Sequence, residues 1–81
     1  MTNKNIAQTA GSIWYKLGEK GRVNLIQLPR LLKQKTQLTY MALGWLARED
    51  KIKYTTKNGR TFVSLNPVEN NIYENLTAVK A

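Results

Sequence analysis

The pair Asn58-Gly59, inside the stretch IKYTTKNGRTFVSL (residues 52–65), constrains the fold of this chain more than any other feature. It is the preferred pair for a two-residue type I′ turn, because both residues accept a positive φ. A turn there pairs Lys57 with Arg60 and, five steps along, Ile52 with Leu65. Since side chains alternate along a strand, the core face should collect Ile52, Tyr54, Val63 and Leu65. The outer face of the predicted hairpin carries Phe62 and the cations Lys53, Lys57 and Arg60.

The segment before the hairpin has the spacing of helices. Apolar residues recur at steps of four, three and four from Ile6 to Leu17, which predicts a helix over residues 5–20 that ends at Gly18 and Gly21. Residues 22–26 are short and partly β-branched, and they predict a brief strand or extended link. Pro29 fits the first turn of a short second helix that starts near Leu28.

A third and a fourth helix complete the expected architecture. Thr36 is a suitable N-cap for a helix over residues 37–49. After the hairpin, Asn66, Pro67 and Glu69 have the spacing of a capped helix start. An apolar stripe follows along this last helix, made by Val68, Ile72, Leu76 and Val79. This stripe must pack either on its own chain or on a second copy.

The composition excludes most catalytic chemistry. The 81 residues include no Cys and no His, which removes disulfides, thiolate chemistry, the common zinc sites and histidine acid/base catalysis. Among the five acids only Glu49 and Asp50 are adjacent, and neighbours on a helix point about 100° apart. We therefore expect no catalytic residue, no metal, no cofactor and no small-molecule substrate, and we predict that the protein is not an enzyme.

The charge and the hydropathy pattern bound the partners and the location. A net charge of +8 favours polyanions, because each neutralised phosphate releases condensed counterions. The alternative is that this charge serves solubility alone. The chain has no run of 18 apolar residues and no signal-like N-terminus. We expect a cytoplasmic protein that does not bind membranes.

The order helix, short strand, helix, helix, hairpin is that of the winged helix-turn-helix fold. The residues ALGWLAREDKI (42–52), together with the Asn-Gly turn, resemble a family of small bacterial winged helix-turn-helix proteins of unknown function. The likeness covers about residues 6–65. It implies a mainly α fold with a three-helix core, a two- or three-stranded wing sheet and a C-terminal helix. We expect one domain over residues 1–81, with its core at about 6–65 and a helical extension at about 66–79.

The resemblance also implies the orientation of the third helix, because its leucines at 43 and 46 match buried positions of the family. At about 100° per residue, Thr39, Ala42, Leu43 and Leu46 then face the core. The outer side is expected to carry Gln37, Tyr40, Met41, Gly44, Trp45 and Arg48. A rival orientation buries Leu38, Ala42 and Trp45 instead.

Two functions fit this outer side. As a nucleic-acid-binding module, a transcription regulator of weak specificity, the chain would contact DNA through Lys33, Lys35, Gln37, Tyr40, Arg48, Lys53, Lys57 and Arg60. The wing cations are equally consistent with a solvated strand face. DNA, RNA and protein partners stay open at this point.

The alternative function is a protein-interaction or homodimerisation domain. Its candidate interface residues are Tyr40, Met41, Trp45, Ile72 and Leu76. Residue types of this kind are enriched at the centres of interfaces. The competing interpretation is that Met41 and Trp45 pack under the fourth helix or the N-terminal segment as ordinary core.

Overall fold

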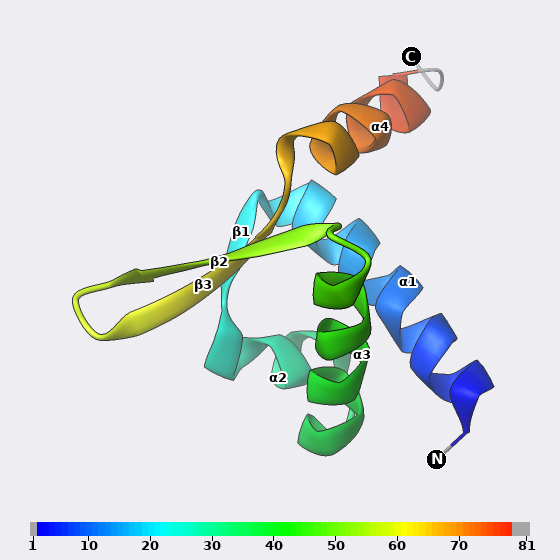
Figure 1. Cartoon of the computed structure of the whole chain (residues 1–81), viewed down its shortest axis with the longest axis vertical. Coiled ribbons are helices and arrows are strands. Elements are labelled where there is room, and N and C mark those ends of the chain that lie inside the picture. Colours follow the sequence, from blue (N-terminus) through cyan, green and yellow to red (C-terminus); the bar gives the residue numbers. More distant parts are fainter. Residues whose placement is uncertain (1, 79–81) are drawn as a thin grey trace.

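A computed structural model describes residues 2–78 of the chain. The elements follow in the order α1 (Asn3–Lys20), β1 (Arg22–Asn24), a short 3-10 helix η1 (Leu25–Gln27), α2 (Leu28–Leu32), α3 (Thr36–Arg48), β2 (Ile52–Lys57), β3 (Arg60–Leu65) and α4 (Pro67–Ala78). The first three α-helices form the body, the β2–β3 hairpin projects from one side of it, and α4 extends away from it (Figure 1). The sequence predicts both this winged helix-turn-helix arrangement and the C-terminal helix that follows it.

Helix α1 is set by a side-chain cap at its start and a glycine at its end. The side-chain oxygen of Thr2 accepts a hydrogen bond from the Asn5 N–H at 3.2 Å, so the helix begins two residues before the predicted start. Gly21 has a φ of 86° and donates its N–H to the Leu17 carbonyl at 2.8 Å. Gly21 therefore ends the helix as predicted, whereas Gly18 lies inside it.

The start of α3 differs by one residue from the prediction. Lys35 occupies the N-cap position and Thr36 is the first helical residue, so the prediction of Thr36 as N-cap is wrong. The side chain of Thr39 donates a hydrogen bond to the Lys35 carbonyl at 2.9 Å. Helix α2 begins at Leu28 as predicted and ends at Lys33, which takes the left-handed conformation with a φ of 55°.

The sheet confirms the hairpin prediction pair by pair. Strands β2 and β3 are antiparallel from Ile52↔Leu65 to Lys57↔Arg60, around the turn at Asn58-Gly59. Strand β1 pairs with the other edge of β3, with Val23 opposite Val63. The strand order is β1-β3-β2, so β3 is central and β2 is an edge strand.

The core lies between α1, α3 and the inner face of the sheet. Its largest fully buried apolar side chains are Ile13, Leu17, Leu28, Leu43 and Val63. The preferred orientation of α3 is confirmed, because Leu43 is 2% exposed and Trp45 is 41% exposed. The rival orientation is wrong for Trp45, although Leu38 is buried as that orientation required.

Tyr54 corrects the predicted core face of the hairpin. The alternation along β2 is right, but the Tyr54 side chain is 46% exposed. Ile52 is the buried residue of β2, and from Lys53 onward the strand is exposed. The reason is that β2 is an edge strand in a hairpin that projects from the body of helices (Figure 1).

Helix α4 has the predicted cap but contacts α1 through other residues than the predicted stripe. The side-chain oxygen of Asn66 accepts a hydrogen bond from the Glu69 N–H at 3.0 Å. The Tyr73 ring packs over Gly18 and edge-on against Trp14, with ring centroids 5.6 Å apart. The predicted stripe residues Val68, Ile72 and Leu76 are exposed, and Val79 lies outside the described residues. The stripe is therefore available on the surface of the single chain.

Replacement of Leu43 by Ala should lower the free energy of unfolding by about 2–5 kcal/mol, because it leaves a cavity in the core. Replacement of Trp45 by Ala should cost much less, because its ring is partly solvated already. Urea unfolding followed by circular dichroism measures both. Equal losses would contradict the orientation of α3.

Replacement of Gly18 by Ala should detach α4 locally, because the new methyl group would overlap the Tyr73 ring. Gly11 is the matched control on the same helix, since a Cβ there meets nothing within 4 Å. Gly11→Ala should stabilise the protein by about 0.5–1 kcal/mol through helix propensity alone. Amide hydrogen exchange along residues 67–78 should accelerate in Gly18→Ala only.

Candidate nucleic-acid interface

The exposed side of α3 is not one uniform patch. At about 100° per residue, Gln37, Gly44 and Arg48 lie along its middle. Tyr40 and Trp45 are five positions apart, which places them about 140° from each other on opposite flanks of this middle line. The sequence analysis predicts that Tyr40, Met41 and Trp45 lie together on the outer side of this helix. The structure places Met41 and Trp45 on the flank beside α1, where they line a shallow depression with Ile6.

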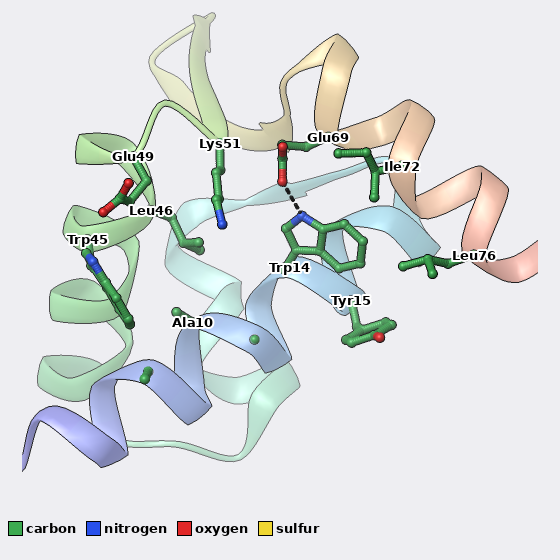
Figure 2. A pocket seen from close by; sticks show the side chains of 12 residues that line it. Ala10, Trp14, Tyr15, Trp45, Leu46, Glu49, Lys51, Glu69, Ile72 and Leu76 are labelled. Carbon is green, nitrogen blue, oxygen red and sulfur yellow. Dashed lines mark hydrogen bonds between the residues drawn. The ribbon is translucent and has the colours of Figure 1, made fainter.

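Trp45 also borders a larger groove between α1, the end of α3 and α4. This groove has a volume of about 690 Å³, and its lining includes Ala7, Gly11, Trp45, Ile72 and Leu76 (Figure 2). Three of the candidate interface residues, Trp45, Ile72 and Leu76, therefore share one surface. Tyr40 and Met41 do not line this groove. The interpretation of Met41 and Trp45 as ordinary core is wrong, since both are exposed.

One side-chain hydrogen bond ties the two walls of this groove together. The Trp14 indole N–H donates to the Glu69 carboxylate at 2.9 Å, and this links α1 to the first turn of α4 (Figure 2). Trp14 also packs edge-on against Tyr15, with ring centroids 5.0 Å apart. We define the groove residues Ala7, Gly11, Trp45, Ile72 and Leu76 as the α1–α4 groove surface.

The start of α3 is electropositive. Lys33 and Lys35 are exposed in the turn between α2 and α3, and Gln37 follows on the first helical turn. The first turn of α3 contains no acidic residue. Because the N-terminal N–H groups of a helix carry partial positive charge, they add to the field of the two lysines. This corner of the molecule favours a phosphate.

The outer face of the sheet carries a second set of cations. Lys53, Lys57 and Arg60 occupy this face as predicted, and all three are exposed. The sequence analysis missed Arg22, which lies on the same face because it pairs with Ser64. Its guanidinium lies 4.5 Å from the centroid of the Phe62 ring, a cation–π contact that accounts for an aromatic residue on the outer face. Which residues of β1 face outward cannot be predicted without knowing the strand with which β1 pairs.

The two sets of cations differ in where they point. The inner sides of α3 and of the sheet share one core, so their outer sides look away from that core in different directions. The tip of the hairpin, with Lys57 and Arg60, projects beyond the body (Figure 1). Lys53 lies at the base of the hairpin instead, opposite Ser64. The tip therefore has the freer reach toward a ligand that lies against α3.

Tyr54 adds no charge to the hairpin near neutral pH. Partial burial raises the pKa of its hydroxyl above the ordinary value of 10.0, because the phenolate is the form that loses hydration. The hairpin between Ile52 and Leu65 thus carries only cationic charge at pH 7, from Lys53, Lys57 and Arg60.

Neither a metal-holding cluster nor a membrane-spanning helix is found in the described part of the chain. Residues 2–78 contain no group of three acidic, Cys or His side chains that could hold a metal ion. Within the same residues, none of the helices combines the length and the apolar character needed to cross a bilayer.

Comparison with known proteins agrees with this architecture. The family model described as a winged helix-turn-helix domain (DUF2582) matches residues 1–65. The uncharacterized protein MJ1608 of Methanocaldococcus jannaschii is 39% identical over 61 residues, which are 72% of this chain and 84% of that protein. This chain therefore belongs to the DUF2582 family of winged helix-turn-helix domains.

Two solved structures are similar as well. The solution structure of protein BT2368 from Bacteroides thetaiotaomicron has a TM-score of 0.71 and 31% identity, and the match covers 82% of this chain and 80% of that one. The transcriptional regulator HlyU from Vibrio vulnificus has a TM-score of 0.75 at 15% identity, with 96% of this chain and 82% of that chain covered. The likeness to HlyU shows the fold.

Proposed function

We propose that this chain is a DNA-binding transcriptional regulator that acts in the cytoplasm. The observation that carries the proposal is the placement of exposed cations at both ends of α3 and at the tip of the hairpin. In this arrangement α3 enters the major groove, and Lys57 and Arg60 contact the phosphates beside it. Lys33 and Lys35 contact phosphates at the start of the helix. A transcriptional regulator, HlyU, among the proteins of similar fold supports the proposal.

The same helix implies weak sequence specificity. Base edges in the major groove are read by side chains such as Arg, Lys, Asn and Gln. On the middle line of α3, Gln37 and Arg48 are of this type, whereas Gly44 between them has no side chain to offer. Tyr40, on the flank, can donate its hydroxyl to a phosphate. Most of the affinity then comes from phosphate contacts, which do not depend on sequence.

Generic duplex DNA should bind this protein at 50 mM salt, with an affinity that falls steeply toward 200 mM salt. Fluorescence anisotropy of a labelled duplex measures this dependence. Each phosphate contact contributes about 0.9 to the slope of log K against log salt. Lys35→Gln, Lys57→Gln and Arg60→Gln should each make the slope shallower by about 0.9, the contribution of one phosphate contact.

Lys4→Gln is the matched control, because this substitution removes the same charge from an exposed residue on the first turn of α1. The control should leave the slope almost unchanged. If Lys4→Gln changes the slope equally, the binding depends on the net charge alone and not on the proposed contacts. Absence of binding at 50 mM salt would remove the proposal.

The second candidate function is homodimerisation through the α1–α4 groove surface. The observation in its favour is that Ile72 and Leu76 are 43% and 50% exposed and line the same groove as Trp45, which lies on the opposite wall (Figure 2). A two-fold axis would let α4 of each copy lie in the groove of the other, which is the reciprocal geometry of most homodimers. Ala7 and Gly11 on the α1 wall are small enough to admit an approaching helix. The two functions are compatible, since the groove lies on the opposite flank of α3 from Tyr40.

The dimer should dissociate on dilution in sedimentation velocity experiments, and Leu76→Glu should shift it to monomer by burying a charge at the interface. Asn71→Glu is the control, since Asn71 is exposed on another side of α4. Both variants should keep the thermal midpoint of the single chain. A wild-type monomer at every concentration tested would contradict this function.

A further inference from the structure

A second pocket lies on the outer face of the sheet, away from α3. It has a volume of about 580 Å³, and its polar lining comes from Lys20, Arg22, Lys53, Thr55, Ser64 and Asn70. These residues belong to the end of α1, to all three strands and to α4. Neither α3 nor the tip of the hairpin contributes to it. The proposed DNA contacts on α3 therefore leave this pocket unexplained.

The register of the sheet arranges the centre of the pocket. Arg22 pairs with Ser64, and Ser64 pairs with Lys53, so the three side chains form one row across β1, β3 and β2. Neighbouring strands are about 4.8 Å apart, which separates the two cationic residues by about 10 Å at the backbone. A hydroxyl lies midway between them. Two long cationic side chains at this spacing can close on one anion above the serine.

The Arg22 side chain is held in place by the sheet itself. Its guanidinium lies 4.5 Å from the centroid of the Phe62 ring, one row further along the outer face. This contact limits the conformations of a long side chain that would otherwise lose entropy on binding a ligand. The planar guanidinium carries several N–H donors in its own plane. Such a donor set suits an oxyanion with several acceptor atoms.

The charged side chains that line the pocket are all of one sign. Of the described residues that line it, Lys20, Arg22 and Lys53 are cations and none is an acid. Two nearby acids are engaged elsewhere, since Glu19 pairs with Lys16 at 3.5 Å and Glu69 accepts from Trp14. Asn70 on α4 adds an amide to the far wall. Three cations together with hydroxyl and amide donors match a multiply charged anion better than a single chloride.

We propose that this pocket is a binding site for a phosphate group, held by Lys20, Arg22 and Lys53 and by the Ser64 hydroxyl. The group can belong to a free phosphorylated compound or to the backbone of a nucleic acid, because both present the same oxygens. The site is independent of the α3 surface. This site gives Arg22 and Phe62 a role, whereas the proposed DNA-binding function gives them none.

The test is a titration of the whole chain with pyrophosphate, used as the probe, at constant ionic strength. Amide ¹H–¹⁵N chemical shifts are recorded, with sodium chloride as the reference titration. Saturable shifts should cluster at Arg22, Lys53, Ser64 and Asn70 with pyrophosphate and not with chloride. Shifts that are absent, or that spread evenly over all cationic residues, would overturn the proposal.

Variants separate a built site from general charge. Arg22→Gln combined with Lys53→Gln should weaken pyrophosphate binding by at least about tenfold, because charge-assisted hydrogen bonds are lost. Lys57→Gln combined with Arg60→Gln removes the same charge at the tip of the same face and should change the affinity by less than about twofold. An equal loss in both pairs would contradict the site. Circular dichroism and the thermal midpoint confirm that each variant is folded.

The affinity of the same variants for duplex DNA distinguishes the two sources of the phosphate group. An unchanged DNA affinity in Arg22→Gln/Lys53→Gln assigns the pocket to a free phosphorylated compound. A loss of DNA affinity that parallels the loss of pyrophosphate binding assigns it to the nucleic-acid backbone. If the wild-type protein binds no DNA, the proposed function fails, while the pyrophosphate titration still decides whether the site exists.

Discussion

Burial of Leu43 and Val63 against Ile13 and Leu17 is the contact on which the rest of this structure depends. It joins α3, the central strand and α1 in one seam, and removal of apolar side chains from water is the main force that stabilises so small a core. The seam sets the rotation of α3 about its own axis. Because Leu43 faces inward, Gln37 and Arg48 face outward. The binding side of α3 is thus a direct consequence of the packing side.

Helix α4 depends on a second and smaller set of contacts. Tyr73 over Gly18 and the Trp14–Glu69 hydrogen bond hold its first half against α1, while Leu76 stays exposed. An aromatic ring can approach the helix backbone at Gly18 because no Cβ is in the way. The same attachment forms one wall of the α1–α4 groove and, through Asn70, one wall of the pocket behind the sheet. The position of α4 therefore links two surfaces that lie on different sides of the molecule.

The basic charge of the chain is divided between distinct surfaces. One group surrounds α3 and the hairpin tip, and another lies behind the sheet around Arg22 and Lys53. The net charge of +8 alone does not distinguish them. Charges further apart than a Debye length act almost independently. The two groups of cations can therefore bind two separate ligands, whereas a single polyanion must be long enough to reach both groups. Their separation allows the two groups of cations to be tested by separate sets of variants.

Apart from the inward side of α3, which was implied by the family resemblance, local patterns in the sequence determined the hairpin register and the order of the helices, because turn preference, capping and apolar spacing act over a few residues. They also placed Lys57 and Arg60 on the outer face. Only the tertiary structure decided that Tyr54 is exposed, that Met41 and Trp45 lie beside α1, and that Arg22 lies in one row with Lys53. Each of these outcomes depends on which distant segment lies alongside: a strand at the edge of a sheet, a helix flank beside α1, a third strand on β3. Burial and proximity between remote segments are set by how the elements pack together, and no pattern within one element carries that information.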